Sequence, residues 1–507
     1  AILAITSGRR SEPLTQSLEE RRERDVSVAM ASAALKVGVR GRVLVTRPAT
    51  EGAQVISVTD EEPEATVAYR STRDASSTPH TFEEVVMRGL APDGGLFVPT
   101  SIPTVSQHHL ECWKNLSFVD LAASVMRLYI PTAEIPTPEL RLLLQRSYDT
   151  FRHPDILPLV KAADDGSMYL LEQFHGPTCA FKDVALQFVG NLFEFFLLRK
   201  AHKPEAGHEA TPDHITVVGA TSGDTGSAAI AGLRGKANIE VFILHPKGRV
   251  APVQEAQMTT VLDDNVHNIA VEGTFDDCQD MVKEMFSDAK FRAEHNLAAV
   301  NSINWARILA QVVYYFYAYL TWVKQTGNAV GAPLRFCVPS GNFGNALACY
   351  YARRMGLPVE QIMVATNSND ILHRFFSSGD FTKTRCMPTL APAMDITIPS
   401  NFERFLFHHA GDDAVWTAKW MGVAKTTVED PTFLPRALEI FTSGTSNDEE
   451  IRVTIQDMIA ARNYRLCPHT ASGVHAALSG PSLPAGDGCV CGCVCVCVCV
   501  SVCVCEC

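Results

Sequence analysis

A lysine and two glycine-rich loops are the parts of this sequence best suited to chemistry. Lys182 precedes an apolar segment with the spacing of a buried helix. The apolar side chains of Ala180 and Phe181 would disfavour a charged amine, which suits a lysine that forms a Schiff base. The alternative is an exposed lysine at a helix start, paired with the adjacent Asp183.

Each glycine loop lies between a strand pattern and a helix pattern. The first covers residues 220–227 (ATSGDTGS) and follows the β-branched segment Ile215–Gly219. The second covers residues 340–345 (SGNFGN), between the predicted strand Arg335–Pro339 and a helix predicted over Ala346–Met355. Backbone N–H groups in such a loop, together with the N-terminus of the following helix, form a site for anions, usually phosphate.

The two loops carry no nucleotide signature. Neither contains the Gly-Lys-Ser/Thr of a P-loop or the GxGxxG pattern of dinucleotide sites. Each could also be only a tight turn, because Asp224, Ser227 and Asn345 are common helix-capping types. A reactive lysine combined with two anion sites is nevertheless what a pyridoxal 5'-phosphate enzyme requires. One loop would bind the cofactor phosphate and the other an anionic group of the substrate.

The surrounding pattern predicts an α/β protein. Strand–loop–helix units of this kind are typical of a parallel sheet, and Val241–Leu244 supplies a third strand. Apolar residues at helical spacing predict long helices over Val184–Lys200 and Ile303–Val323. Earlier in the chain, Thr81–Gly89 predicts a short helix that opens with a capping box, and Leu96–Val98 predicts a short strand.

Length and composition exclude several classes of protein. A chain of 507 residues has room for about two to three domains, and 46% hydrophobic residues are enough for a large core. The net charge of −12 argues against a nucleic-acid partner. The longest apolar stretch, Ile308–Val323, contains Gln311 and is too short for a typical membrane span, so no membrane partner is predicted. Either a monomer or a homodimer is expected.

The cysteines fall into two groups. Seven are scattered singly and none belongs to a CxxC pair, so neither a disulfide framework nor a metal site is predicted. This pattern favours a reducing, intracellular compartment, namely the cytoplasm, with mitochondria left open. The other nine lie between Cys489 and Cys507 and mostly alternate with valine.

We interpret the Cys–Val tail as a translation artefact. The codons TGT and GTG encode Cys and Val, so a TG repeat would give this pattern, and the natural C-terminus would be lost from about Ser479 onward. The alternatives are a metal-binding thiolate strand and an exposed β tail, the latter disfavoured because so many free thiols would oxidise.

At the N-terminal end, residues 1–66 predict a disordered or unrelated extension, since a transit peptide would contain fewer acidic residues.

Several motifs together resemble the threonine synthase family, which belongs to fold type II of the pyridoxal-phosphate enzymes. They occur in the family's order between about Tyr69 and Ala477. In chain order, the motifs are 69–73 (YRSTR), 89–99 (GLAPDGGLFVP), 174–183 (FHGPTCAFKD, the lysine motif), 220–229 (the substrate loop), 301–307 (NSINWAR), 339–345 (the cofactor-phosphate loop) and 468–471 (PHTA).

The resemblance implies a role for each site residue. Lys182 would bind the cofactor covalently and, once displaced by substrate, remove the α-proton. Thr470 would hydrogen-bond the pyridine nitrogen, and a hydroxyl at that place limits unwanted transamination. Arg307 is a candidate for the substrate phosphate, with a helix-surface salt bridge as its alternative. Backbone N–H groups would bind the cofactor phosphate at Gly341, Asn342, Phe343, Gly344 and Asn345. The substrate carboxylate or phosphate would be met by Thr221, Ser222, Asp224 and Thr225.

Within the family the chain looks most like the animal threonine synthase-like 2 branch by overall similarity, and it has no P-loop of the kind that the sister branch carries. That branch implies a phospholyase that removes phosphate from O-phosphothreonine, and from O-phosphohomoserine, to give 2-oxobutyrate, ammonia and phosphate. One alternative is a threonine synthase, which converts O-phosphohomoserine and water to threonine and phosphate. Another is a catalytically dead binding or signalling protein. A serine/threonine dehydratase is disfavoured, because Ala180 stands where that class has serine.

The resemblance also implies a domain arrangement. Fold type II, with a tryptophan synthase β-like architecture, places the cofactor in a cleft between two α/β domains and adds an N-terminal helical region here. The expected boundaries are an extension at 1–66, an N-terminal domain at 67–152, a large cofactor domain at 153–182 and 298–480, a small substrate domain at 183–297 and the tail at 481–507.

Overall fold

The computed structural model describes eight segments of the chain. They are residues 44–47, 54–58, 67–163, 168–201, 214–298, 300–422, 430–479 and 489–493. The chain divides into two compact units, Ala1–Glu64 and Ala65–Cys507, and each is described by itself. In the first unit, β1 (Leu44–Arg47) and β2 (Gln54–Val58) form an antiparallel pair. The rest of the predicted extension at 1–66 lies outside the described residues.

The second unit begins with the expected helical region, in which two short strands pair antiparallel. The predicted capping box is confirmed: the Thr81 hydroxyl accepts from the backbone N–H of Glu84, and the Glu84 carboxylate accepts from that of Thr81. The predicted short strand is shifted by one residue and includes Pro99. The elements are β3 (Tyr69–Ser71), α2 (Phe82–Arg88), β4 (Phe97–Pro99), α3 (Gln107–Trp113), α4 (Phe118–Arg127) and α5 (Thr137–Tyr148).

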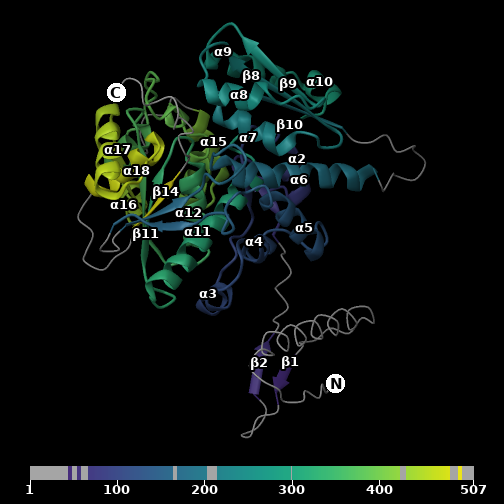
Figure 1. Cartoon of the computed structure of the whole chain (residues 1–507). Helices are drawn as coiled ribbons and strands as arrows, with labels where there is room; N and C mark the ends of the chain where they lie inside the picture. Colours follow the sequence, from purple (N-terminus) through teal and green to yellow (C-terminus); the bar gives the residue numbers. More distant parts are fainter. Residues whose placement is uncertain are drawn as a thin grey trace, which may run out of the picture. The chain divides into compact units, whose positions relative to one another are not determined.

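Four parallel strands form a sheet in the middle of the sequence, in the order β10–β7–β8–β9. The predicted strands over Ile215–Gly219 and Val241–Leu244 are confirmed. Figure 1 shows helices α8, α9 and α10 grouped around these strands. The elements are β7 (Ile215–Ala220), α7 (Asp224–Leu233), β8 (Ile239–Pro246), α8 (Pro252–Thr259), β9 (Val266–Val271), α9 (Phe275–Ser287), α10 (Ala289–Glu294) and β10 (Leu297–Ala298).

Six strands form the larger sheet, in the order β13–β12–β11–β14–β6–β5. All neighbours are parallel except β5 and β6. The strands are β5 (Leu159–Lys161), β6 (Met168–Glu172), β11 (Leu334–Pro339), β12 (Val359–Thr366), β13 (Phe441–Thr445) and β14 (Cys489–Cys493). Two largely parallel sheets with helices packed on them confirm the predicted α/β class.

Strand β14 comes from the Cys–Val tail. It lies between β11 and β6, with Cys491 opposite Cys337 on one side and Leu170 on the other. The backbones of β11 and β6 are therefore joined through it. For residues 489–493, this position argues against the alternative of an exposed β tail. The interpretation of the tail as a translation artefact stays a prediction.

Two long helices connect the sheets. The first, α6 (Lys182–Ala201), packs on α7, and the second, α11 (Trp305–Thr326), packs on α6 and on α12 (Gly344–Arg354). Both predicted helices are confirmed, each with its start shifted by two residues. Most of α11 is buried, which is typical of a helix enclosed by a large core.

The remaining helices follow the strands of the large sheet. They are α13 (Ile371–Ser378), the short 3₁₀ helix η1 (Pro392–Met394), α14 (Phe402–His409), α15 (Ala414–Gly422), α16 (Phe433–Leu438), α17 (Asp448–Arg462) and α18 (Pro468–Ser479). The last of them, α18, packs along the face of β11, β12, β13 and β14. Among the helices that the structure describes, none is both long and apolar enough to cross a membrane.

Candidate active site

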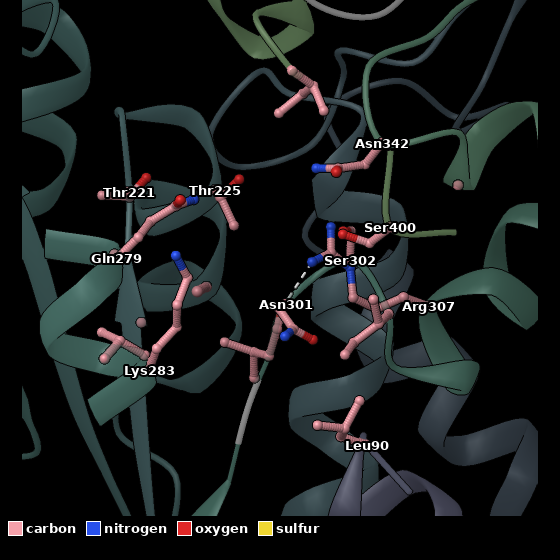
Figure 2. Close-up of a pocket in the computed structure, with 18 of the residues that line it drawn as sticks. Leu90, Thr221, Thr225, Gln279, Lys283, Asn301, Ser302, Arg307, Asn342 and Ser400 are labelled. Atoms are coloured by element: carbon pink, nitrogen blue, oxygen red, sulfur yellow. Dashed lines mark hydrogen bonds between the residues drawn. The ribbon is translucent and has the colours of Figure 1, made fainter. Parts of the chain in front are cut away.

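A single cavity of about 2380 Å³ brings most of the predicted site residues together. Figure 2 shows Thr221 and Thr225 on one wall, with Asn342 and Arg307 on the opposite wall. The predicted residues that line the cavity are Lys182, Thr221, Ser222, Asp224, Thr225, Arg307, Gly341, Asn342, Phe343, Gly344 and Asn345. Residues distant in the sequence therefore meet where the sequence patterns placed a site.

Lys182 is the first residue of α6, and its side chain is 12% exposed. Its Nζ donates to Oδ2 of Asp224 and lies 5.6 Å from the centre of the Phe181 ring. The alternative pairing with Asp183 is therefore wrong. Burial alone would raise the pKa of Asp224, but the charge and hydrogen bond of Lys182, together with smaller contributions from His469 and the backbone of Thr225, hold the pKa below its usual value. The amine thus lies at the cavity wall with one carboxylate partner.

Asp183 instead fixes the loop that precedes the lysine. Its carboxylate accepts hydrogen bonds from the backbone N–H of Thr178 at 2.9 Å and from its hydroxyl at 2.7 Å. A Cβ atom at Gly176 would lie 2.5 Å from Cβ of Asp183, so this close approach requires glycine. Burial raises the pKa of Asp183 to about 6, and the hydrogen bonds from Thr178 offset only part of that effect. These contacts determine where α6 starts, and so where Lys182 lies.

The buried carboxyl of Asp183 predicts a pH-dependent stability. An Asp titrates near pH 4 in an unfolded chain, whereas the pKa of Asp183 in the fold is about 6. The folded protein binds more protons between these values, so this stabilising contribution is full below about pH 4 and is lost as the pH rises through about 6. The loss is about 3 kcal/mol. We expect the advantage of the wild type over Asp183→Asn in urea unfolding to shrink across this range.

Thr178→Val is the matched control for this titration. The variant lacks a hydroxyl whose hydrogen bond lowers the pKa of Asp183, but it keeps the carboxyl that titrates. Its pH dependence should therefore persist and extend to higher pH. A stability difference between the wild type and Asp183→Asn that stays constant from about pH 4 to about pH 7 would contradict the assignment.

The loop at 340–345 is built as a cradle of backbone N–H groups. Helix α12 begins at Gly344, and the first N–H groups of a helix have no acceptor within it. Phe343 has a φ of 62° and its ring packs 5.0 Å from that of Phe402 in the core, so its contribution to the cavity comes from its backbone. A Cβ atom at Gly341 would lie 2.8 Å from the carbonyl oxygen of Ala393, so this position requires glycine.

Two tyrosines of α11 hold Asn345, the last residue of this loop, in place. Its Oδ1 accepts from the hydroxyl of Tyr315 at 2.6 Å and from that of Tyr314, and Tyr315 also donates to its backbone oxygen at 3.0 Å. Its side-chain oxygen is therefore engaged with the helix behind it. The backbone N–H of Asn345, in the first turn of α12, is a donor that this residue can offer to an anion.

The first glycine loop is closed by Thr221. Its hydroxyl accepts from the backbone N–H groups of Gly223 and Gly226 at 2.9 and 2.8 Å. Helix α7 begins one residue after Gly223, and its N-terminus favours an anion. Asp224 carries a negative charge that faces Lys182, which suits a cationic rather than an anionic group of a ligand.

Arg307 is buried in the first turn of α11, with 2% of its surface exposed. Its Nη1 donates to the carbonyl oxygen of Val300 at 2.8 Å, and its Nε has no hydrogen-bond partner among the described residues. Burial lowers the pKa of Arg307 to about 10, with Asp224 acting in the opposite direction, so the side chain stays charged at neutral pH. The helix-surface alternative is therefore wrong. A buried guanidinium beside Asn301 and Ser302 suits an anionic ligand (Figure 2).

Comparison with known proteins agrees with this geometry. A family model described as threonine synthase N terminus matches residues 68–148, and one described as pyridoxal-phosphate dependent enzyme matches residues 156–426. The threonine synthase of Schizosaccharomyces pombe is 51% identical over 437 residues, which cover 81% of this chain and 83% of the relative. The chain belongs to the threonine synthase family.

Solved structures of threonine synthases share the fold. The yeast enzyme aligns with a TM-score of 0.78 at 47% identity, over 84% of this chain and 87% of that one. The enzyme of Brucella melitensis, solved with pyridoxal phosphate bound, aligns with a TM-score of 0.78 at 38% identity, over 85% and 89% of the two chains. The chain therefore has the predicted fold type II architecture, and its cofactor is pyridoxal 5'-phosphate.

The residues of the cavity fit this cofactor by their own chemistry. The Ser340 hydroxyl, next to the backbone cradle, is buried without a hydrogen-bond partner among the described residues. A phosphate group there would satisfy it together with the N–H groups of the α12 N-terminus. Lys182 lines the same cavity and supplies the amine.

Thr470 is not brought to this cavity. It is fully buried in α18, and its hydroxyl lies 3.1 Å from Sγ of Cys467. Its neighbour His469 lines the cavity instead and accepts from the backbone N–H of Ala393 at 3.2 Å. The contact between Thr470 and the pyridine nitrogen stays a prediction, which would require the hydroxyl to turn from Cys467.

Sequence reasoning missed several residues that line the cavity. His469 lies in a recognised motif, which gave a signal that was not used. Gln279 and Lys283 lie on a polar helix face and Ser400 in a loop, so local patterns carried no signal for them. The missed polar residues labelled in Figure 2 are Gln279, Lys283, Asn301, Ser302 and Ser400.

The comparisons do not favour the animal branch that the sequence resemblance suggested. Threonine synthase-like 2 of Xenopus laevis is 39% identical over 78% of this chain. This identity is lower than the 51% shared with the S. pombe threonine synthase. Membership of the family is thus shown, whereas the expected placement in the branch is not.

Proposed function

We propose that the protein is a threonine synthase that converts O-phosphohomoserine and water to threonine and phosphate. The observation that carries the proposal is the identity of 51% with a fungal threonine synthase, against 39% with threonine synthase-like 2. The intact Lys182 and both intact anion loops support an active enzyme rather than a dead fold.

Pyridoxal phosphate, when bound, supplies an electron sink for negative charge at the substrate carbon atoms. The residues of the chain would do the rest. The amine of Lys182 would hold the cofactor and, once displaced by the substrate amine, accept the α-proton. The backbone N–H groups at 341–345 would bind the cofactor phosphate.

The substrate would be held by three groups around that amine. The N-terminus of α7, with Ser222 and Thr225, would bind the α-carboxylate. Asp224 would face the substrate ammonium as it faces Lys182 in this structure. Arg307 would bind the phosphate through its charged guanidinium, from the wall opposite α7 (Figure 2).

The test measures phosphate release from O-phosphohomoserine, O-phosphothreonine and O-phosphoserine in parallel. Threonine, 2-oxobutyrate and ammonia are quantified as the organic products. We expect threonine and phosphate in equal amounts from O-phosphohomoserine. 2-Oxobutyrate and ammonia as the main products would assign the phospholyase instead, and no turnover by protein with bound cofactor would support a dead fold.

A further inference from the structure

Two polar residues of α9 face the active-site cavity without a role in the proposed function. Gln279 and Lys283 are four residues apart, so they lie on one face of the helix. Both line the cavity. Figure 2 shows them on the same wall as Thr221 and across the cavity from Asn301 and Ser302.

Lys283 is a cation with a weak partner. Its Nζ lies 2.7 Å from Oδ1 of Asp280, but the two side chains are 70% and 72% exposed. An exposed ion pair between neighbours on a helix contributes little, because water and salt screen it. The ammonium can therefore exchange Asp280 for a more highly charged anion at small cost.

Arg307 on the opposite wall does not neutralise the whole charge of a substrate phosphate. A phosphate monoester carries about −1.5 to −2 charges at neutral pH, more than one guanidinium balances. Arg307 already donates its Nη1 to Val300, and Lys182 is committed to the cofactor. A second cation would complete the charge balance, and the wall formed by α9 carries one in Lys283.

The other charged residues of α9 that line the cavity are acidic. Asp276 and Asp280 line the same part of the cavity, and both would repel a phosphate. Lys283 is the one basic residue of α9. Arg249 and Arg292 from neighbouring segments also line the cavity, but Lys283 is the cation that Figure 2 places across from Asn301 and Ser302. Its ammonium would offset the two carboxylates, and the amide of Gln279, one turn away, can add a neutral hydrogen bond.

We propose that Lys283, assisted by Gln279, binds the substrate phosphate from the small-domain wall while Arg307 binds it from the opposite wall. The inference rests on the proposed function for the identity of the substrate. It adds a specificity determinant, because the pair would favour phosphorylated amino acids over the unphosphorylated ones.

The experiment uses the cofactor-loaded enzyme and the variants Lys283→Met and Lys283→Arg. We expect Lys283→Met to raise the KM for O-phosphohomoserine about tenfold, the effect of one charge-assisted hydrogen bond, with kcat changed by less than about twofold. Inhibition by inorganic phosphate should weaken by the same factor. Inhibition by homoserine, which has no phosphate, should be unchanged, and Lys283→Arg should retain most of the affinity.

Lys290→Met is the matched control. Lys290 on α10 is also exposed and also pairs with a carboxylate of its own helix, Glu294, but it does not line the cavity. This variant should match the wild type in every measurement. A KM within twofold of the wild type for Lys283→Met, or an equal loss of homoserine and phosphate inhibition, would overturn the inference.

Direct titration separates this inference from the proposed function. Calorimetry of inorganic phosphate with the cofactor-loaded wild type and Lys283→Met needs no turnover. If the wild type fails to make threonine but binds phosphate about tenfold more tightly than the variant, the proposed function fails and the phosphate contact stands. Equal phosphate binding by the two proteins would refute the contact whatever the product.

Discussion

Lys182→Ala should abolish catalysis. Lys182 lines the cavity within the lysine motif, and its amine would both join the cofactor and accept the substrate α-proton, so one substitution removes both functions. We expect kcat to fall by at least about 10⁴-fold, the upper range for loss of a positioned base. The absorbance band of lysine-bound pyridoxal phosphate should disappear at the same time. Steady-state product assays and absorbance spectra of the purified variant measure both effects.

Lys182→Arg is the control that separates chemistry from folding. Alanine would leave the carboxylate of Asp224 in the cavity without its ammonium partner, and that alone could cost stability. Arginine keeps a positive charge near Asp224, but it stays protonated and can neither join the cofactor nor accept a proton. Lys182→Arg should therefore unfold near the wild-type temperature and still be inactive. Turnover within about tenfold of the wild type in either variant would remove Lys182 from the mechanism.

The parts of the site that sequence reasoning found are those with local signals. Gly176 is required by its close approach to Asp183 and Gly341 by its close approach to Ala393, and both glycines lie in short motifs that can be read from one sequence. The strand and helix on each side of a loop have clear apolar periodicity. The sequence alone therefore predicts Lys182 at a helix start together with two anion loops.

The missed parts depend on contacts between distant segments. Tyr314 and Tyr315 belong to an apolar helix, and only the fold shows that both reach Asn345, about 30 residues away. The burial of Arg307 likewise results from packing around α11, so its alternative as a surface residue could not be rejected from spacing. The alternative pairing of Lys182 with Asp183 was wrong for the same reason, because the actual partner, Asp224, lies 42 residues further along the chain.

The choice between synthase and lyase lies beyond such patterns. Both reactions would use the same lysine and the same two loops, so motifs common to the family cannot separate them. Overall identity favours the fungal threonine synthases, and this correction of the animal-branch expectation came from comparison rather than from any single residue. Residues outside the motifs, such as Lys283 on α9, are where branch differences in substrate would be found.

A chain that ends after Ser479 should fail to fold into a cofactor-binding protein. Such a chain loses β14, which supplies the backbone partner of β11 on one side and of β6 on the other. The two strands would then face each other across an empty strand position, each with unpaired N–H and C=O groups in the middle of a sheet. We expect the truncated protein to aggregate and to show neither a cooperative thermal transition nor cofactor absorbance. A chain that ends after Cys493 keeps the strand and is the matched control.

A point substitution tests the same strand without changing the length of the chain. Cys491 is paired with Cys337 and with Leu170, so it lies at the end of the ladder with β11 and at the centre of the ladder with β6. Cys491→Pro removes the backbone N–H and should cost about 3 kcal/mol or more, whereas Cys491→Val keeps the N–H and has high strand propensity. The urea midpoint should therefore fall sharply for proline and stay near the wild type for valine. If the chain ending after Ser479 and Cys491→Pro both bind cofactor like the wild type, β14 contributes nothing to the sheet, and the tail has no more structural role than the artefact interpretation gives it.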